Sequence, residues 1–209
     1  MKIIIIALLA ITSSFAAISE QSYTELSTEV FGLFKNEFSR LDYPVELELF
    51  WKGGLPLAIT SFEQEEDPAN NHYAISLWGG LARHKNMDEK GWIFSVCHEI
   101  GHIIGGAPHV QDEKNSWGSV EGQADFFATS VCLPKYYKNA DENELKIIRY
   151  ETAQSLANFF NESDSEQWAS VEVLSKEIVL ETILDDYPSN QCRVDTIRLN
   201  ERLECWFKK

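Results

Sequence analysis

Two histidines bracket a glutamate in the segment His98-Glu99-Ile100-Gly101-His102. Each residue of an α-helix turns the chain by about 100°, so His98 and His102 lie about 40° apart on one face. The opposite face of the same helix is apolar, with Ile93, Val96, Ile100, Ile103 and Ile104. The pattern predicts a helix that begins at a cap on Asn86 or Asp88 and ends at Gly105-Gly106. Such a helix buries its apolar side and turns two imidazoles towards one point.

This arrangement of two histidines on a helix indicates a zinc site. Glu99 lies about 100° round the helix from His98 and about 60° from His102. There it could take a proton from a zinc-bound water without binding the metal itself. The motif is short enough to arise by chance, so the interpretation depends on finding a third ligand.

One candidate for the third ligand is a histidine in the following loop, as in the pattern H-E-x-x-H-x-x-G-x-x-H with a later methionine turn. Gly105 occupies the glycine position, but Pro108 stands where that ligand is required. His109 comes one residue late, and no methionine follows the motif. The minor alternative is a shifted loop that places His109 close enough to act as the third ligand.

The other candidate is Glu121, in a helix predicted from about Ser119 to Leu133. Glu121 and Asp125 are four residues apart and share one helix face. Glu121 would complete a set of two histidines and one glutamate, with the fourth position left for water. Asp125 could accept the N–H of a ligand histidine and fix its tautomer. In a chain with 33 acidic residues, the pair could instead be a solvated acidic face.

The stretch H-E-I-G-H followed by E-G-Q-A-D-F-F-A resembles the gluzincin class of zinc metallopeptidases over about residues 92–134. It is most similar to the minigluzincins and the ImmA/IrrE-type peptidases. The resemblance implies one Zn²⁺ per chain bound by His98, His102 and Glu121, with Glu99 as general base and Asp125 supporting the ligands. It also implies an edge strand before the motif helix that binds substrate in extended form, which we assign to residues 72–80.

These residues predict a zinc metallopeptidase that acts on peptides or proteins, most simply as an endopeptidase. The alternative is a non-catalytic zinc-binding or interaction protein on the same scaffold. Glu99 favours catalysis, because a structural site has no need of it and has four protein ligands. Hydrolysis also needs a donor to the developing oxyanion, and the sequence does not choose between His109, Tyr150, Tyr187 and Arg193.

Periodic patterns divide the rest of the chain. Helical spacing predicts helices over residues 20–41, 141–161 and 165–185, and alternation predicts strands over 45–51, about 55–62 and 72–78. The tail from residue 187 is predicted to be irregular or partly helical. One helix, a short antiparallel or mixed sheet and then the motif helices and C-terminal helices predict an α+β fold. We expect a single zincin-like metallopeptidase domain over residues 17–209.

Residues 1–16 are typical of a secretory signal peptide. Lys2 precedes an apolar run, and the small residues Ser14 and Ala16 precede the expected cut. A cut after Ser19 is the second option. The apolar run falls short of the ~20 residues of a membrane span. We therefore expect an exported protein, periplasmic or secreted, that keeps no membrane anchor.

The charge and the cysteines agree with export. A net charge of −15 provides no basic surface for nucleic acid. Four cysteines, an even number, favour disulfides in an exported protein. Three pairings are possible, and we favour Cys97–Cys132 with Cys192–Cys205. The sequence does not indicate an oligomeric state.

Overall fold

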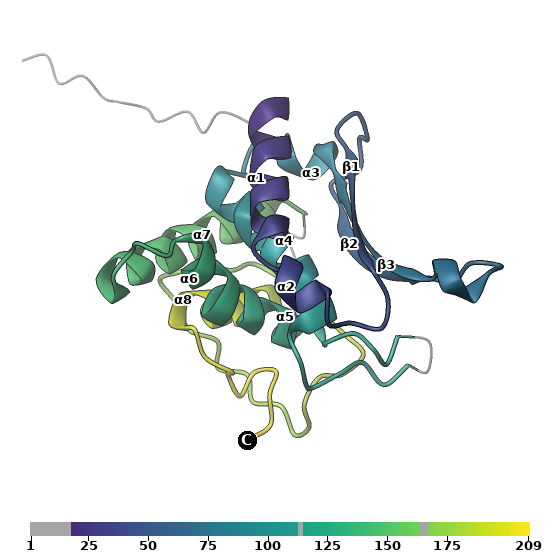
Figure 1. Cartoon of the computed structure of the whole chain (residues 1–209). Coiled ribbons are helices and arrows are strands. Elements are labelled where there is room, and N and C mark those ends of the chain that lie inside the picture. The colour runs from purple at the N-terminus through teal and green to yellow at the C-terminus, as the bar shows by residue number, and fades with distance from the viewer. Residues whose placement is uncertain (1–17, 113–114, 164–166) are drawn as a thin grey trace, which may run out of the picture.

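The structure, a computed structural model, describes residues 18–112, 115–163 and 167–209. The predicted signal peptide lies outside these residues. The described chain is α+β, with helices packed on one side of a three-stranded mixed sheet (Figure 1). The N-terminal helix, the sheet, the motif helix, the helix of Glu121 and the C-terminal helices follow in the predicted order.

The N-terminal helix is shorter than predicted. α1 (Glu20–Gly32) is capped at its N-terminus by Ser19, whose hydroxyl accepts a hydrogen bond from the Ser22 N–H. The chain then turns, and a separate short helix, α2 (Lys35–Phe38), follows. Phe34 and Phe38 are both buried. The apolar spacing predicted one helix because both pieces pack on the same core.

The sheet has the strand order β1–β3–β2, with β1 (Val45–Phe50), β2 (Ala58–Glu63) and β3 (His72–Trp78). The central strand β3 is parallel to β1 and antiparallel to β2. The prediction that residues 72–80 form an edge strand is therefore wrong. That segment comes just before the motif helix in sequence, but it has a strand paired on each side. The edge strand that contacts the motif helix is β2.

Short elements join the strands to the motif helix. η1 (Pro68–Asn70) lies between β2 and β3, and α3 (Gly79–Ala82) follows β3. A Cβ atom at Gly80 would lie 2.3 Å from the carbonyl oxygens of Gly54 and Leu55. Glycine is required here because two backbone segments meet at this point.

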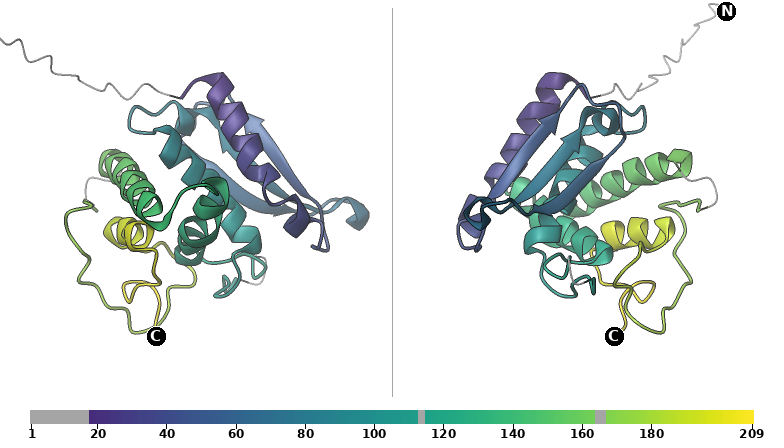
Figure 2. Two further views of the ribbon diagram at one scale, coloured as in Figure 1. Left: turned by 60° about the vertical axis from the view of Figure 1, so that its left-hand side comes forward. Right: turned by 90° about the vertical axis from the view of Figure 1, so that its right-hand side faces the viewer.

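The motif helix α4 (Glu89–Ile104) lies at the centre of the fold and packs against α1, α5, α7 and β2 (Figure 2). Asp88 caps the N-terminus of this helix, because its carboxylate accepts a hydrogen bond from the Gly91 N–H. Its buried side chains include Trp92, Phe94 and Ile100. The predicted helix, its cap at Asp88 and its end at Gly105 are confirmed.

The helix of Glu121 continues beyond its predicted end at Pro134. α5 (Glu121–Phe127) runs into a π-helical stretch, η2 (Ala128–Cys132), and then into α6 (Leu133–Tyr136). The Leu133 N–H donates to the Ala128 carbonyl, five residues back. Pro134 stands in the first turn of α6, where its missing N–H is tolerated.

Two helices form the C-terminal part, α7 (Glu142–Ser163) and α8 (Asn190–Leu199). The helix predicted over residues 165–185 is wrong, because the described residues 167–189 are irregular. Their backbone bonds to other segments: the Val179 N–H donates to the Glu204 carbonyl, and the Ile183 N–H to the Trp206 carbonyl. Both donors belong to β-branched residues, which favour extended backbone.

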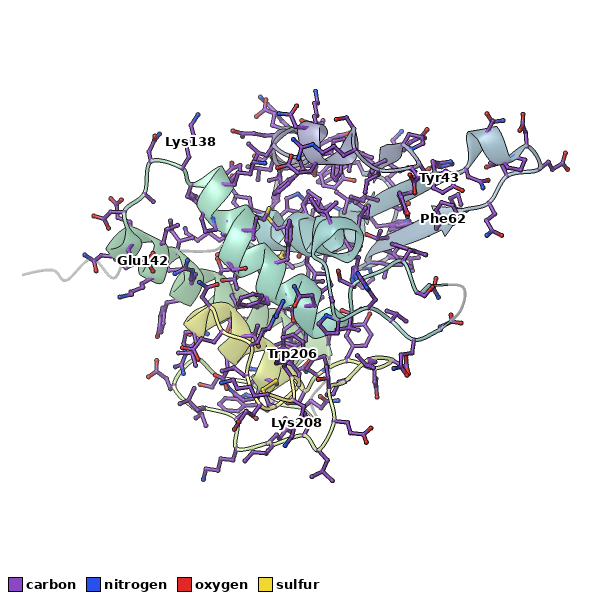
Figure 3. The ribbon with its side chains drawn as sticks, turned by 60° about the horizontal axis from the view of Figure 1, so that its bottom comes forward. Tyr43, Phe62, Lys138, Glu142, Trp206 and Lys208 are labelled. Atoms are coloured by element: carbon purple, nitrogen blue, oxygen red, sulfur yellow. A yellow bond between two sulfur atoms is a disulfide. The ribbon has the colours of Figure 1, made fainter. Side chains whose placement is uncertain are left out.

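Both predicted disulfides are confirmed. Cys97–Cys132 joins α4 to η2, and Cys192–Cys205 joins α8 to the C-terminal tail. The tail also packs on α5 through Trp206, whose ring would lie 2.4 Å from a Cβ atom at Gly122 (Figure 3). Disulfides are typical of oxidising compartments. None of the helices in the described part of the chain is long and apolar enough to cross a bilayer.

Candidate metal centre

Three side chains from two helices meet in one cluster. His98 and His102 project from α4, and their Nε2 atoms lie 3.1 Å apart. Glu121, in the first turn of α5, places a carboxylate oxygen 3.2 Å from His98 Nε2 and its other oxygen 3.7 Å from His102 Nε2. One ligand atom from each residue lies within 4.8 Å of the other two. This group could hold one metal ion.

The other ring nitrogens fix which atom of each histidine faces the cluster. His98 Nδ1–H donates to Asp125 Oδ1 at 2.7 Å, and His102 Nδ1–H donates to the Ser119 carbonyl at 2.8 Å. A carboxylate and a carbonyl can only accept, so Nδ1 carries the proton in both rings. Nε2 is then the atom of each ring that can bind a metal.

The residues present fit a metal ion. With hydrogen on Nδ1 of both histidines, the buried Oε2 of Glu121, which lies 3.2 Å from His98 Nε2, accepts no hydrogen bond from the described residues. A buried polar atom without a partner is costly, and a cation between the three side chains would provide one. Two imidazoles and one carboxylate are a donor set that zinc accepts at sites with an open fourth position.

The electrostatics of the cluster also favour a bound cation. Burial disfavours the charged form of His98, but Asp125 and Glu121 outweigh it and raise the pKa of His98 to about 10. Burial also disfavours ionised Glu121, yet His98, His102 and Arg193 lower its pKa to about 2. The carboxylates are therefore ionised. The negative potential that favours a proton on His98 also favours a divalent cation.

A buried ion pair lies behind the cluster. Asp125 is fully buried, and Arg193 of α8 binds it with Nε at 2.7 Å from Oδ2 and Nη2 at 2.9 Å from Oδ1. The guanidinium lies 5.2 Å from the ring centre of Phe160 and 5.4 Å from that of Tyr187. Burial favours the neutral acid, but Arg193 and His98 hold the pKa of Asp125 well below its usual range. Arg193, predicted as an oxyanion or substrate residue, therefore positions Asp125.

Glu99 is buried beside the ligands, and β2 holds it in place. The Thr60 hydroxyl lies 2.8 Å from Glu99 Oε2 and 2.9 Å from the Glu99 carbonyl oxygen, and donates to this residue. The contact orients the carboxylate and ties the motif helix to the edge strand. No pattern in the sequence pointed to Thr60, which is a single residue 39 positions away.

The cluster opens on two cavities. A cavity of about 260 Å³ is lined by Glu99, the three clustered side chains and residues 56–60 of the edge strand and its approach. A smaller cavity of about 120 Å³ shares His102 and Glu121 with it. Tyr187 lines both. A molecule bound in either cavity would therefore lie beside the cluster.

Two predicted site residues lie elsewhere. His109 is exposed, bridges Ser119 through its backbone and lines neither cavity. Tyr150 donates its hydroxyl to Glu172 at 2.7 Å and lines a separate cavity beside α7. The structure brings neither residue to the cluster, so the loop alternative for the third ligand is not supported.

No protein-family model matches this chain, and neither a curated protein nor a solved structure matches it. The functional argument therefore depends on the motif and on the geometry of its side chains.

We expect the protein to bind one Zn²⁺ per chain, measured by equilibrium dialysis with metal analysis. Glu121→Ala should lower the affinity at least ~100-fold because it removes one of three ligands, and Asp125→Asn should lower it about 10- to 100-fold. His109→Ala is the matched control and should bind as the wild type does. Two ions per chain, no ion, or a loss in the His109 variant would contradict this arrangement.

Proposed function

We propose that this chain is an exported, zinc-dependent metallopeptidase of the gluzincin type that hydrolyses peptide bonds. The observation that carries the proposal is that a buried glutamate, Glu99, shares one cavity wall with the three side chains that could hold the metal. Zinc held by His98, His102 and Glu121 would supply an activated water and polarise the scissile carbonyl.

Glu99 would act as general base and then as general acid. Its carboxylate takes a proton from the attacking water and returns it to the nitrogen of the leaving amine. The Thr60 hydroxyl donates a hydrogen bond to Glu99 Oε2 and so fixes the direction of the carboxylate. A fixed carboxylate supports proton transfer, because general-base catalysis requires the base to stay within hydrogen-bond reach of the proton that it moves.

The edge strand β2 would bind the substrate backbone. Among the described residues, β2 pairs with a strand along one side only, through β3, so its other side would offer N–H and C=O groups to an extended peptide. Residues 56–60 line the cavity that holds Glu99. A peptide added beside them would pass across the cluster.

Tyr187 would donate to the oxyanion that develops as water attacks. Burial of the hydroxyl and the neighbouring Glu121 carboxylate raise the pKa of Tyr187 to about 12. The O–H group therefore stays protonated at neutral pH. Tyr187 and Arg193 both line the cavity, but the Tyr187 hydroxyl lies beside the proposed metal ligand Glu121, whereas Arg193 is bound to Asp125.

The competing function is a non-catalytic zinc-binding or interaction protein. A structural zinc site is closed by four protein ligands. Within the described ranges the cluster brings together three ligand residues, His98, His102 and Glu121. An open fourth position beside a cavity supports catalysis over a structural role.

Export is supported by the two disulfides and by the pattern of residues 1–16. Ile18 belongs to the core and is 5% exposed, and Ser19 caps α1. A cut after Ser19 would remove both. We therefore propose that cleavage falls after Ala16.

Intact-mass measurement of the protein secreted by its natural host should give an N-terminus at Ala17. This position keeps the buried Ile18 and the cap of α1. An N-terminus at Glu20 would contradict the proposed cut.

Glu99→Gln should keep zinc and lose hydrolysis by at least ~1,000-fold, because the amide cannot accept the water proton. The measurement is cleavage of a mixed peptide library by the zinc-loaded protein, with zinc content checked in both forms. Cleavage by the variant at the wild-type rate would remove Glu99 as the base. A wild type that binds zinc and cleaves nothing would favour the non-catalytic function.

Tyr187→Phe should lower kcat about 10- to 100-fold with little change in KM, because the lost hydrogen bond forms mainly in the transition state. Tyr150→Phe is the matched control, since that hydroxyl lies outside the cavity. Equal kcat values for the wild type and the Tyr187 variant would contradict the assignment.

A further inference from the structure

We propose that the cleft selects peptides with a bulky apolar side chain on one side of the scissile bond and a cationic group on the other. The inference rests on the proposed peptidase function and names its substrate class. It follows from the different linings of the two cavities that meet at the metal cluster.

The larger cavity has an apolar wall. This wall comes from α3, α4 and α7 and the turn before α4, and consists of Leu81, Met87, Phe94, Leu156, Phe159 and Phe160. Arg193 also lines this cavity, but its guanidinium is bound to Asp125. A volume of about 260 Å³ leaves room for a large side chain. Burial of a Leu or Phe side chain there corresponds to about 10- to 100-fold in binding.

The smaller cavity has three acidic residues in its wall. Asp185, Asp186 and Glu121 line it together with His102, Tyr187 and the aliphatic residues Val110 and Leu184. One oxygen of each aspartate is already used: Asp185 Oδ1 accepts from the Gln111 N–H at 3.1 Å, and Asp186 Oδ1 accepts from the Tyr187 N–H at 2.8 Å. These bonds hold both carboxylates in place and leave the second oxygen of each available.

The acidic cavity is part of the substrate path because two of the proposed metal ligands, His102 and Glu121, stand in its wall. A group bound there would be a near neighbour of the reacting bond. No lysine or arginine in the described ranges forms an ion pair with Asp185 or Asp186. Among the described residues, no cation neutralises these two carboxylates, which attract a cation of the substrate in a chain whose net charge is −15.

The cation can come from two sources that share one chemistry, a lysine or arginine side chain or the free α-amine of the substrate. Both offer N–H donors and a positive charge to the two carboxylates. Asp185 and Asp186 are exposed, so the attraction is screened and should be worth about 3- to 10-fold.

The test uses short N-acetylated peptides in matched pairs. Each carries Phe on one side of the central bond and either Lys or Gln on the other, in both orders, and a third form has Gln with a free N-terminus. Zinc-loaded protein gives kcat/KM, and the Glu99→Gln variant gives Kd by fluorescence anisotropy of labelled peptides. Asp185→Asn/Asp186→Asn removes the two charges and keeps the side-chain carbonyls.

The matched control is Glu65→Gln/Glu66→Gln. It removes the same two charges from an exposed loop that projects from the body of the molecule between β2 and η1 (Figure 1). Any effect of net charge alone should therefore appear equally in both double variants.

We expect the Lys peptide to be preferred over its Gln partner about 3- to 10-fold in kcat/KM and in Kd. The preference should fall below about 2-fold in the Asp185/Asp186 variant and persist in the control. Replacing Phe with Ala should cost about 10- to 100-fold. If instead the peptide with a free N-terminus shows this preference, the bound cation is the α-amine, and the acidic cavity is still the site that binds it.

Equal constants for Lys, Gln and free-amine peptides, equal losses in both double variants, or indifference to the Phe→Ala change would overturn the inference. Cleavage of no peptide, combined with tighter binding of the Lys peptide that depends on Asp185 and Asp186, would refute the proposed hydrolysis and leave the binding preference standing. Failure of the proposed hydrolysis and failure of the proposed substrate preference therefore give different results.

Discussion

The hydrogen bonds that converge on the carboxylate of Asp125 hold the cluster of His98, His102 and Glu121 to the rest of the fold. His98 donates from α4 and Arg193 from α8, while Asp125 itself belongs to α5. A buried carboxylate is tolerated only when it is paired, and loss of one partner from such a group costs about 3–5 kcal/mol. The orientation of His98, a proposed metal ligand, and the docking of a C-terminal helix therefore depend on the same group of atoms.

Covalent and packing contacts hold each member of this network in place. Cys97 directly precedes His98, Cys192 directly precedes Arg193, and Trp206 packs on the residue that follows Glu121. The disulfides span 35 and 13 positions, and loops of these lengths correspond to about 3–4 kcal/mol each in the chain-entropy model. A site built on helices held in this way keeps its side chains at fixed positions, which both metal binding and general-base catalysis require.

The local parts of the site could be predicted from the sequence, and the long-range parts could not. Helical spacing and ligand chemistry predicted the group of His98, His102, Glu121 and Asp125 that the structure brings together, and Pro108 argued against His109, which lies outside the cluster. The strand order was missed because pairing between strands is not encoded by the alternation within each one. The helix predicted over residues 165–185 failed because its apolar residues also suit an extended segment. The contact of Arg193 with Asp125 joins single residues 68 positions apart, for which no sequence pattern exists.

The central claim is that two histidines and one glutamate hold a metal at an open site beside Glu99. A crystal structure of the zinc-loaded protein, with anomalous diffraction at the zinc edge, tests it most directly. The account predicts one zinc peak bound by His98 Nε2, His102 Nε2 and the Glu121 carboxylate, with solvent as the remaining ligand and Glu99 free of the metal. A fourth protein ligand, such as His109 brought in by a rearranged loop, would contradict it.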